Sequence, residues 1–564
     1  MPYPSLEQYN LAFQAHSRVL DDPELRSGTV ATTGLGLPLA ISGGFALTYT
    51  IKSGVKKYAV RCFHRESKAL EQRYKAISRK ISSLHSPYFL DFQFQPHGIN
   101  VGGVSYPIVK MEWAKGETLG EFLEVNRRSA QKMAKLSASI ESLAAYLEKE
   151  KIAHGDFQTG NLMVSDGGAT VQLIDYDGMF VDEIDTLGSS ELGHVNFQHP
   201  LRQKTNPFNH TLDRFSLISL WLALKSLQID PSIWDKSNSE LDAIVFRAND
   251  FVDPGSSSIL GMLSGIQQLS TFIKNFALIC ASAMEKTPSL GDFIAGRNIP
   301  VLLTSVSMNG DIPSSRLKSG YISAYRVLSA LEYNTCLQRV GDKVEVIGKI
   351  VEVSLKVTRY GKPYIIINFG NWRDNIFKIS IWNEGLKILP IKPDSSWVGK
   401  WISVVGLMEP PYRTGKNRHS HLSINVTTIG QMTVLSEKDA QWRLAGPDNK
   451  QKTQTSIISN KEALDRIKGN SISATPKPIS AKTTSANQAI LDKILASAQP
   501  SAPARTQTHN ALPNKSSTHY ATPALTPASQ QISSTQNIPS KTVTPIKQAS
   551  RANIIKKIFK WLFG

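Results

Sequence analysis

The stretch His154-Gly-Asp-Phe-Gln-Thr-Gly-Asn161, with the Leu173-Ile-Asp-Tyr-Asp-Gly178 that follows it, decides how the rest of the chain is interpreted. Asp156 and Asn161 stand in the spacing D-x-x-x-x-N, and Asp175 ends an apolar strand. Phosphoryl transfer from a nucleotide requires one carboxylate to orient the attacking hydroxyl. It also requires an amide oxygen and a second carboxylate that hold magnesium. The pattern therefore predicts Asp156 as catalytic and Asn161 and Asp175 as metal ligands.

A second apolar stretch supports this interpretation. Leu212-Asp-Arg-Phe-Ser-Leu-Ile-Ser-Leu-Trp-Leu-Ala-Leu224 is apolar on most faces and predicts a buried helix. With the motif at 154–178 it resembles the protein-kinase-like fold, in the atypical Ser/Thr-kinase-like form of bacteria. The central helix of that family carries an early aspartate that anchors the catalytic loop. Asp213 matches it, so His154 and Asp213 are expected structural anchors. The resemblance covers roughly residues 20–300 and implies ATP and Mg²⁺ as cofactors.

The segment ahead of the motif predicts a hairpin that covers phosphates. Strand patterns at 41–51 and 57–63 are joined by a glycine-containing turn, and a glycine pair lies inside the first; glycine lets backbone amides approach a phosphate closely. Arg61 stands where the kinase family has lysine, and the resemblance implies that it holds phosphates and acts in catalysis with Asp156 and Asn161. Glu71 is either its ion-pair partner or a solvated surface residue. The implied ATP-binding residues are Ser42, Gly43, Gly44, Phe45, Arg61, Glu71 and, at the hinge, Glu112, Trp113 and Ala114.

Several positions depart from the kinase pattern. Ile41 and Ala46 replace two glycines of the phosphate turn, Gln158 replaces a lysine, and Asp177 replaces the glycine of Asp-Phe-Gly. We expect an enzyme that transfers phosphate from ATP to a hydroxyl of a protein substrate or client, with the Ser/Thr type favoured. The alternative is a weak or inactive pseudokinase that works as an adaptor.

The pattern changes to alternating β-strands near residue 341. Strands are predicted at 343–354, 363–369, 376–382, 399–408 and 421–426, with a short helix at 384–389. Five strands, a glycine inside the first and a helix before the fourth resemble an OB-fold barrel. We expect this module to recruit the kinase-like domain to its partner.

Basic and aromatic side chains gather in two loops of this module. OB-folds bind single strands by stacking bases on aromatic rings in a basic groove, so we expect single-stranded nucleic acid here, with protein contact as the alternative. Trp372, Phe377 and Trp382 either add stacking or belong to the core. The expected nucleic-acid-binding residues are Lys356, Arg359, Tyr360, Lys362, Tyr412, Arg413, Lys416 and Arg418.

The last part of the chain is basic and of low complexity. Of the formal net charge of +18, most comes from residues 446–564, which carry 16 Lys and Arg against 4 Asp and Glu. Rich in Ser, Thr, Ala and Pro, residues 446–549 cannot bury enough apolar surface to fold and are predicted to be disordered. Residues 551–564 predict a basic amphipathic helix, too short to span a bilayer, that binds an acidic membrane surface or a partner groove.

The three cysteines, Cys62, Cys280 and Cys336, lie far apart without a CxxC spacing, which fits a reducing compartment. The first residues lack the basic and apolar regions of a signal peptide, and no transmembrane segment is predicted. We therefore expect a cytoplasmic protein, held at the membrane periphery if the last helix binds lipid.

The predicted fold class is α+β, with a bilobal protein-kinase-like domain, a small five-stranded OB-fold β-barrel and a disordered basic tail. The expected parts are a lead-in (1–37), the kinase-like N-lobe and hinge (38–114), its C-lobe (115–300), a helical connector (301–337), the OB-fold-like barrel (338–440), the linker (446–549) and the last helix (551–564).

Overall fold

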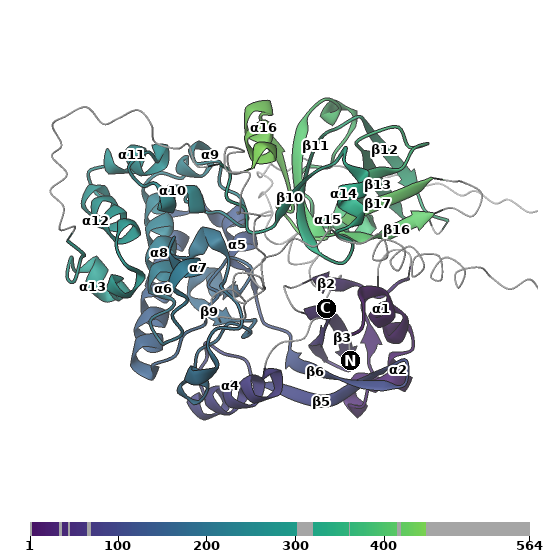
Figure 1. Ribbon diagram of the computed structural model, residues 1–564, viewed down its shortest axis with the longest axis horizontal. Helices are drawn as coiled ribbons and strands as arrows, with labels where there is room; N and C mark the ends of the chain where they lie inside the picture. Colours follow the sequence, from purple (N-terminus) through teal and green to yellow (C-terminus); the bar gives the residue numbers. More distant parts are fainter. Residues whose placement is uncertain are drawn as a thin grey trace, which may run out of the picture. The chain divides into compact units, whose positions relative to one another are not determined.

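The computed structural model describes residues 3–32, 36–42, 46–64, 69–301, 320–359, 361–413 and 419–446. The chain divides into two compact units, and all of these residues belong to the first, Met1–Ser471 with Ile555–Gly564. The fold is α+β, with several sheets and many helices (Figure 1). The predicted linker and last helix lie outside the described residues.

An antiparallel sheet forms the N-terminal part. Its order is β1-β3-β4-β6-β5, with β2 also paired to β3, and the predicted hairpin over 41–63 is present as β2, β3 and β4. The stacked rings of Phe13 and Tyr49, 3.8 Å apart, join the lead-in helices to the sheet. The elements are α1 (Leu6–Gln14), α2 (His16–Val19), α3 (Pro23–Arg26), β1 (Thr29–Val30), β2 (Ala40–Ser42), β3 (Ala46–Ser53), β4 (Lys56–Phe63), α4 (Leu70–Leu84), β5 (Phe92–Val101) and β6 (Val104–Glu112).

A mainly helical part follows, with α6 packed beside α8 at its centre. Most of α8 is buried, as its apolar sequence predicts. The elements are β7 (Glu117–Thr118), α5 (Leu119–Asn126), α6 (Ala130–Glu150), β8 (Leu162–Ser165), β9 (Thr170–Leu173), α7 (Arg202–Thr205), α8 (Arg214–Ile229), α9 (Ile233–Lys236), α10 (Ala248–Val252), α11 (Ser258–Ser264), α12 (Ser270–Ala281) and α13 (Leu290–Ile294), with 3-10 helices η1 (Asp166–Gly168), η2 (Asp182–Leu187), η3 (Val195–Phe197) and η4 (Met284–Lys286).

Two sheets make up the C-terminal part: β10-β11-β15-β18, and β12-β13-β14-β17-β16. In this part, wherever the structure describes it, no closed barrel is found, and the five-stranded OB-fold barrel stays a prediction. The elements are β10 (Arg326–Ser329), α14 (Tyr333–Leu337), β11 (Lys343–Lys349), β12 (Glu352–Val357), β13 (Pro363–Asn368), β14 (Ile376–Ile381), α15 (Asn383–Ile388), η5 (Ser395–Trp397), β15 (Trp401–Leu407), β16 (Glu409–Arg413), β17 (Ser420–Asn425), β18 (Met432–Leu435) and α16 (Glu437–Ala445).

The predicted helical connector is wrong over its described portion. Residues 326–329 form β10, which pairs in parallel with β11, and only α14 is helical. Leu328 is buried in the core of the β-sheets, so pairing with a neighbouring strand outweighed the helical pattern of the segment.

Gly348 has a packing role, because a Cβ atom there would lie 2.5 Å from the Phe369 ring.

Glu409 makes stability depend on pH. It is largely buried at the start of β16 and accepts a hydrogen bond from Asn425 Nδ2 (3.1 Å), and burial raises its pKa to about 7. The folded chain therefore holds a proton that the unfolded chain releases above its own pKa of 4.5. Since the folded pKa is the higher one, stability is lost as pH rises from 4.5 through about 7, by at most about 3 kcal/mol.

Replacing Glu409 by Gln is expected to remove this loss. Urea unfolding at about pH 5 and about pH 8 should show that the variant gains stability over wild type as the pH rises. Replacing the exposed Glu332 by Gln serves as the control, and its difference from wild type should stay constant. If the Glu409 variant follows wild type at both pH values, the raised pKa is wrong.

Candidate functional site

The carboxylate of Asp213, the residue before α8, fixes the loop at 154–161. Its carboxylate accepts hydrogen bonds from the backbone nitrogens of His154 (2.5 Å) and Gly155 (2.8 Å). His154 Nε2 lies 2.9 Å from the Ile174 carbonyl, which ties the loop to the segment that carries Asp175. Burial raises the pKa of Asp213, although the two backbone donors oppose that rise. The two expected structural anchors are therefore in direct contact.

Asp156 is held by three donors. Its Oδ1 accepts from the backbone nitrogen of His194 (2.7 Å), and its Oδ2 accepts from Gln158 Nε2 (2.5 Å) and Asn161 Nδ2 (2.9 Å). Because Asn161 uses its amide nitrogen here, its amide oxygen points away from Asp156. Gly193 has a φ of 74°, and a Cβ atom on it would lie 3.1 Å from Asp156 Oδ1. The chain therefore passes close to this carboxylate where only glycine fits.

Arg61 reaches from β4 to the two aspartates after β9. Its Nη1 lies 2.5 Å from Asp175 Oδ1 and its Nη2 lies 2.6 Å from Asp177 Oδ2, and the Tyr74 hydroxyl also donates to Asp177. Burial raises the pKa of Asp177 to about 6, because it outweighs the opposing effect of Arg61. Asp175 has a left-handed φ of 68°, and such backbone strain in a non-glycine residue is concentrated at functional sites. The buried guanidinium of Arg61 thus joins the N-terminal sheet to the loop that carries Asp175 and Asp177.

Other expected ATP-binding residues have different surroundings. Glu71 pairs with Lys75 (2.5 Å) on an exposed helix face, so it is the solvated surface residue and not the partner of Arg61. At the expected hinge, the Trp113 backbone nitrogen donates to the Lys57 carbonyl (2.8 Å), and that hydrogen bond already uses this donor. Glu112 is paired with Lys56 (3.2 Å), and Ala114 follows β6. Of the phosphate turn, Ser42 ends β2, while Gly43, Gly44 and Phe45 lie outside the described residues.

Magnesium binding by Asn161 and Asp175 stays a prediction. Across the part of the chain that the structure describes, no group of three or more His, Cys, Asp or Glu is placed to hold a metal ion. Mg²⁺ takes only one or two protein carboxylates and completes its shell with waters and substrate phosphates. One carboxylate and one amide oxygen, both hard oxygen donors, fit that demand.

Sequence reasoning missed three contributors to the site. Tyr74 and His194 are 103 and 38 positions from the aspartates that they contact, so no local spacing could reveal them. Glu191 lies near the same aspartates, and burial together with Asp156 raises its pKa. The one local sign of these residues in the sequence is Gly193, next to His194. A glycine allows the backbone to pass close to a functional side chain.

Of the residues expected to bind nucleic acid, Lys356 and Tyr412 lie on the outer face of the five-stranded sheet. Trp382 lies there as well, together with Tyr364 and Lys378, which were not predicted. Lys356 pairs in register with Tyr364, whose ring lies 4.9 Å from that of Trp382. Tyr412 is 63% exposed, and Lys378 Nζ lies 5.9 Å from its ring. We call this surface, made by Lys356, Tyr364, Lys378, Trp382 and Tyr412, the aromatic face.

The remaining residues expected to bind nucleic acid divide into several groups. Arg359 and Lys362 are exposed in the β12–β13 loop, and Lys362 lies 3.8 Å from Glu384. Trp372 is 48% exposed, whereas Phe377 is buried in the core, which settles the choice between stacking and packing for Phe377. Arg413 ends β16 without a described side chain, and Tyr360, Lys416 and Arg418 lie outside the described residues.

Comparison with known proteins supplies no relative: no protein family matches the chain, and no curated protein matches its sequence. Within the described ranges, no helix is long and apolar enough to cross a membrane.

Proposed function

We propose that the chain is an ATP- and Mg²⁺-dependent phosphotransferase of the protein-kinase-like class that acts on a protein hydroxyl. The observation that carries this proposal is the convergence of Asp156, Asn161 and Asp213 on one loop, with Asp175 beside it on the Arg61 ion pair. An antiparallel sheet with one helix between β4 and β5, followed by a mainly helical part, supports the bilobal arrangement expected of that class.

In the proposed mechanism the acceptor hydroxyl lies at Asp156. Three donors hold this carboxylate in one orientation, so it can accept a hydrogen bond from the hydroxyl and take its proton as the phosphoryl group is transferred. Asn161 and Asp175 would hold Mg²⁺, which supplies positive charge to the phosphates when bound. Arg61 contributes a cation next to Asp175, through its contacts with Asp175 and Asp177.

The contacts of Arg61 also favour the alternative, an adaptor that binds nucleotide without transferring phosphate. Both terminal nitrogens of Arg61 already contact carboxylates, so binding to phosphates requires the guanidinium to share or exchange these partners. The test is transfer of labelled phosphate from Mg-ATP by wild type and by Asp156→Asn. A thermal shift on Mg-ATP without transfer to any of a broad panel of proteins supports the adaptor.

We also propose that the aromatic face binds single-stranded nucleic acid. Neighbouring aromatic rings interleaved with lysines suit a sequence-tolerant single-strand site, because bases can stack on such rings. The strand order supports an OB-like module: β11 continues into β12 and β15 into β16 after short breaks, and β14 pairs in parallel with β17. The loop residues Arg359, Lys362 and Arg413 belong to the same proposal.

Removing Lys356 and Lys378 is expected to weaken binding of oligo(dT) by the full chain and to make it less sensitive to salt. For every phosphate that the protein no longer neutralises, the slope of log K against log salt becomes shallower by about 0.7 for a single strand. Fluorescence anisotropy across a salt series of wild type and Lys356→Gln/Lys378→Gln measures that slope. Lys349→Gln, an exposed change on the other sheet, is the control. If the slope of log K against log salt is equal for all three proteins, protein contact remains as the role of the C-terminal β-region.

A further inference from the structure

A cavity of about 250 Å³ lies apart from the proposed nucleotide site. Its walls come from α1, residues 37–41, the loop at 240–242, residues 321–325 and strands β11 and β15, with residues 427–433 completing it. None of the residues that line it is Arg61, Asp156, Asn161 or Asp175. Its volume is just below the usual range for small-molecule sites, so it suits a ligand smaller than a nucleotide.

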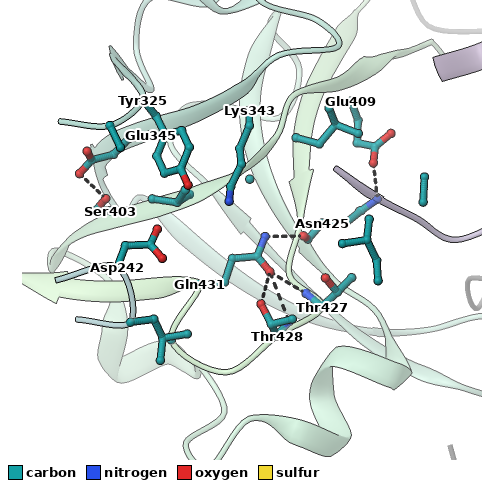
Figure 2. Close-up of a pocket in the computed structure, with 18 of the residues that line it drawn as sticks. Asp242, Tyr325, Lys343, Glu345, Ser403, Glu409, Asn425, Thr427, Thr428 and Gln431 are labelled. Atoms are coloured by element: carbon teal, nitrogen blue, oxygen red, sulfur yellow. Dashed lines mark hydrogen bonds between the residues drawn. The ribbon is translucent and has the colours of Figure 1, made fainter. Parts of the chain in front are cut away.

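Two opposite charges face this cavity without touching. Figure 2 shows the Lys343 side chain and the Asp242 carboxylate directed into it from different elements. Among the residues that the structure describes, no ion pair within 4.0 Å joins these two groups. They are near enough to interact: burial by itself lowers the pKa of Lys343, but Tyr325, Asp242 and Asp156 reverse that effect and the net direction is upward. An amine and a carboxylate held apart across a cavity match a ligand that carries both charges.

The other acidic side chains at the cavity already have partners. Glu345 accepts from Arg443 Nη1 (2.9 Å) and from Ser403 Oγ (2.8 Å), and Glu240 pairs with Arg443 and with Arg247 (3.2 Å). Glu409 accepts from Asn425, and burial raises its pKa to about 7. Within the described lining, Lys343 and Asp242 are therefore two opposite charges that face each other without an ion-pair partner, and the Lys343 amine also hydrogen-bonds to the Tyr325 hydroxyl.

The surroundings of this pair are held in place. Gln431 Oε1 accepts from the Thr427 nitrogen (2.8 Å), and its Nε2 donates to the Asn425 carbonyl (2.8 Å), as Figure 2 shows. On the other side, Asn196 Nδ2 donates to the Asp242 carbonyl (2.9 Å) and fixes the loop that carries the carboxylate. Lys343 Nζ lies 4.6 Å from the centre of the Tyr325 ring. A preformed site needs little ordering when a ligand binds.

The cavity also adjoins the candidate catalytic loop. His194 lines it, its backbone nitrogen donates to Asp156 (2.7 Å), and its ring lies 5.8 Å from the Tyr325 ring. A ligand in this cavity contacts residues such as His194, which is hydrogen-bonded to Asp156. Its binding does not depend on phosphoryl transfer.

We propose that this cavity binds a small zwitterion of the α-amino-acid class, with its carboxylate on Lys343 and its ammonium group on Asp242. Charge-assisted hydrogen bonds at both ends would fix the ligand in one direction. Loss of either charge from the ligand leaves one half-buried protein charge unpaired, so both are required for tight binding.

The experiment is a thermal-shift screen of the full chain against each common amino acid, followed by calorimetric titration of the strongest binder. Its amide, which lacks the carboxylate charge, and its N-acetyl derivative, which lacks the ammonium group, are titrated in parallel. Both derivatives should bind wild type at least tenfold more weakly than the parent amino acid. The proposal is overturned if no amino acid stabilises wild type, or if either derivative binds as tightly as its parent.

The variants assign each end of the ligand. Lys343→Met should lose the preference for the amino acid over its amide, and Asp242→Asn should lose the preference over the N-acetyl derivative. Lys343→Arg keeps the cation and should keep the preference, and the exposed Lys349→Met is the matched control. Unchanged preferences in folded Lys343→Met and Asp242→Asn also overturn the proposal. Absence of ATP transfer by wild type would refute the proposed function alone, because these titrations contain no nucleotide.

Discussion

Replacing Asp156 by Asn is expected to lower phosphoryl transfer from Mg-ATP by about 10²–10⁴-fold, the range that a general base contributes. Asn has the same shape, but its amide cannot take the acceptor proton. Its amide nitrogen would also face at least one of the three donors, from His194, Gln158 and Asn161, that now hold the carboxylate. The rate is measured as labelled phosphate incorporated into protein under saturating ATP.

Two measurements separate this effect from damage to the fold. Asp156 is not an expected ATP ligand, so the thermal shift on Mg-ATP should be similar in wild type and Asp156→Asn. Asp166→Asn makes the same chemical change on the exposed η1 turn and should leave transfer within about twofold of wild type. Undiminished transfer in Asp156→Asn would remove this residue, and the proposed general-base mechanism, from the account of phosphoryl transfer.

Replacing Arg61 by Met is expected to lower the free energy of unfolding by about 3–5 kcal/mol. The Arg61 side chain is only 7% exposed and Asp177 only 10%, so removing the cation leaves a buried carboxylate uncompensated. Asp175 loses the same partner at 2.5 Å. Denaturant unfolding of the full chain measures the change.

The matched comparison is Arg79→Met, which breaks an Arg–Glu183 pair whose side chains are 65% and 53% exposed. Exposed pairs contribute about 0–1 kcal/mol, so this variant should remain close to wild type. The double change Arg61→Met/Asp177→Asn should recover part of the loss, since it removes one of the unpaired charges. Similar losses for Arg61→Met and Arg79→Met would show that the buried ion pair does not stabilise the fold.

The part of the site that could be predicted consists of residues that lie a few positions apart in the sequence. Asp156 and Asn161 are five positions apart, and the hydrogen bond between their side chains follows from that spacing once a turn forms. Asp213 is predictable because it precedes an apolar run that has to be buried. The α+β class and the first hairpin follow from periodicity in the same way.

What could not be predicted depends on contacts between distant segments. The Arg61–Asp177 pair joins residues 116 positions apart, and neither residue carries a local sign of the other. Lys378 belongs to the aromatic face only through the register of β14, which no single-strand pattern specifies. The segment at 326–329 became a strand because β11 offers it an edge.

The C-terminal β-region is fastened to the helical part at both of its ends. At its entry, Asn249 binds the Gly320 carbonyl (2.9 Å) and the Ile322 nitrogen (3.1 Å); at its exit, Arg443 of α16 pairs with Glu240. A module tied at one end can swing about its linker, whereas one tied at both ends has to break the hydrogen bonds at its entry and the buried ion pair at its exit before it moves. Heat should therefore melt these two regions in one shared transition, and a ligand that stabilises either region should raise the melting temperature of both.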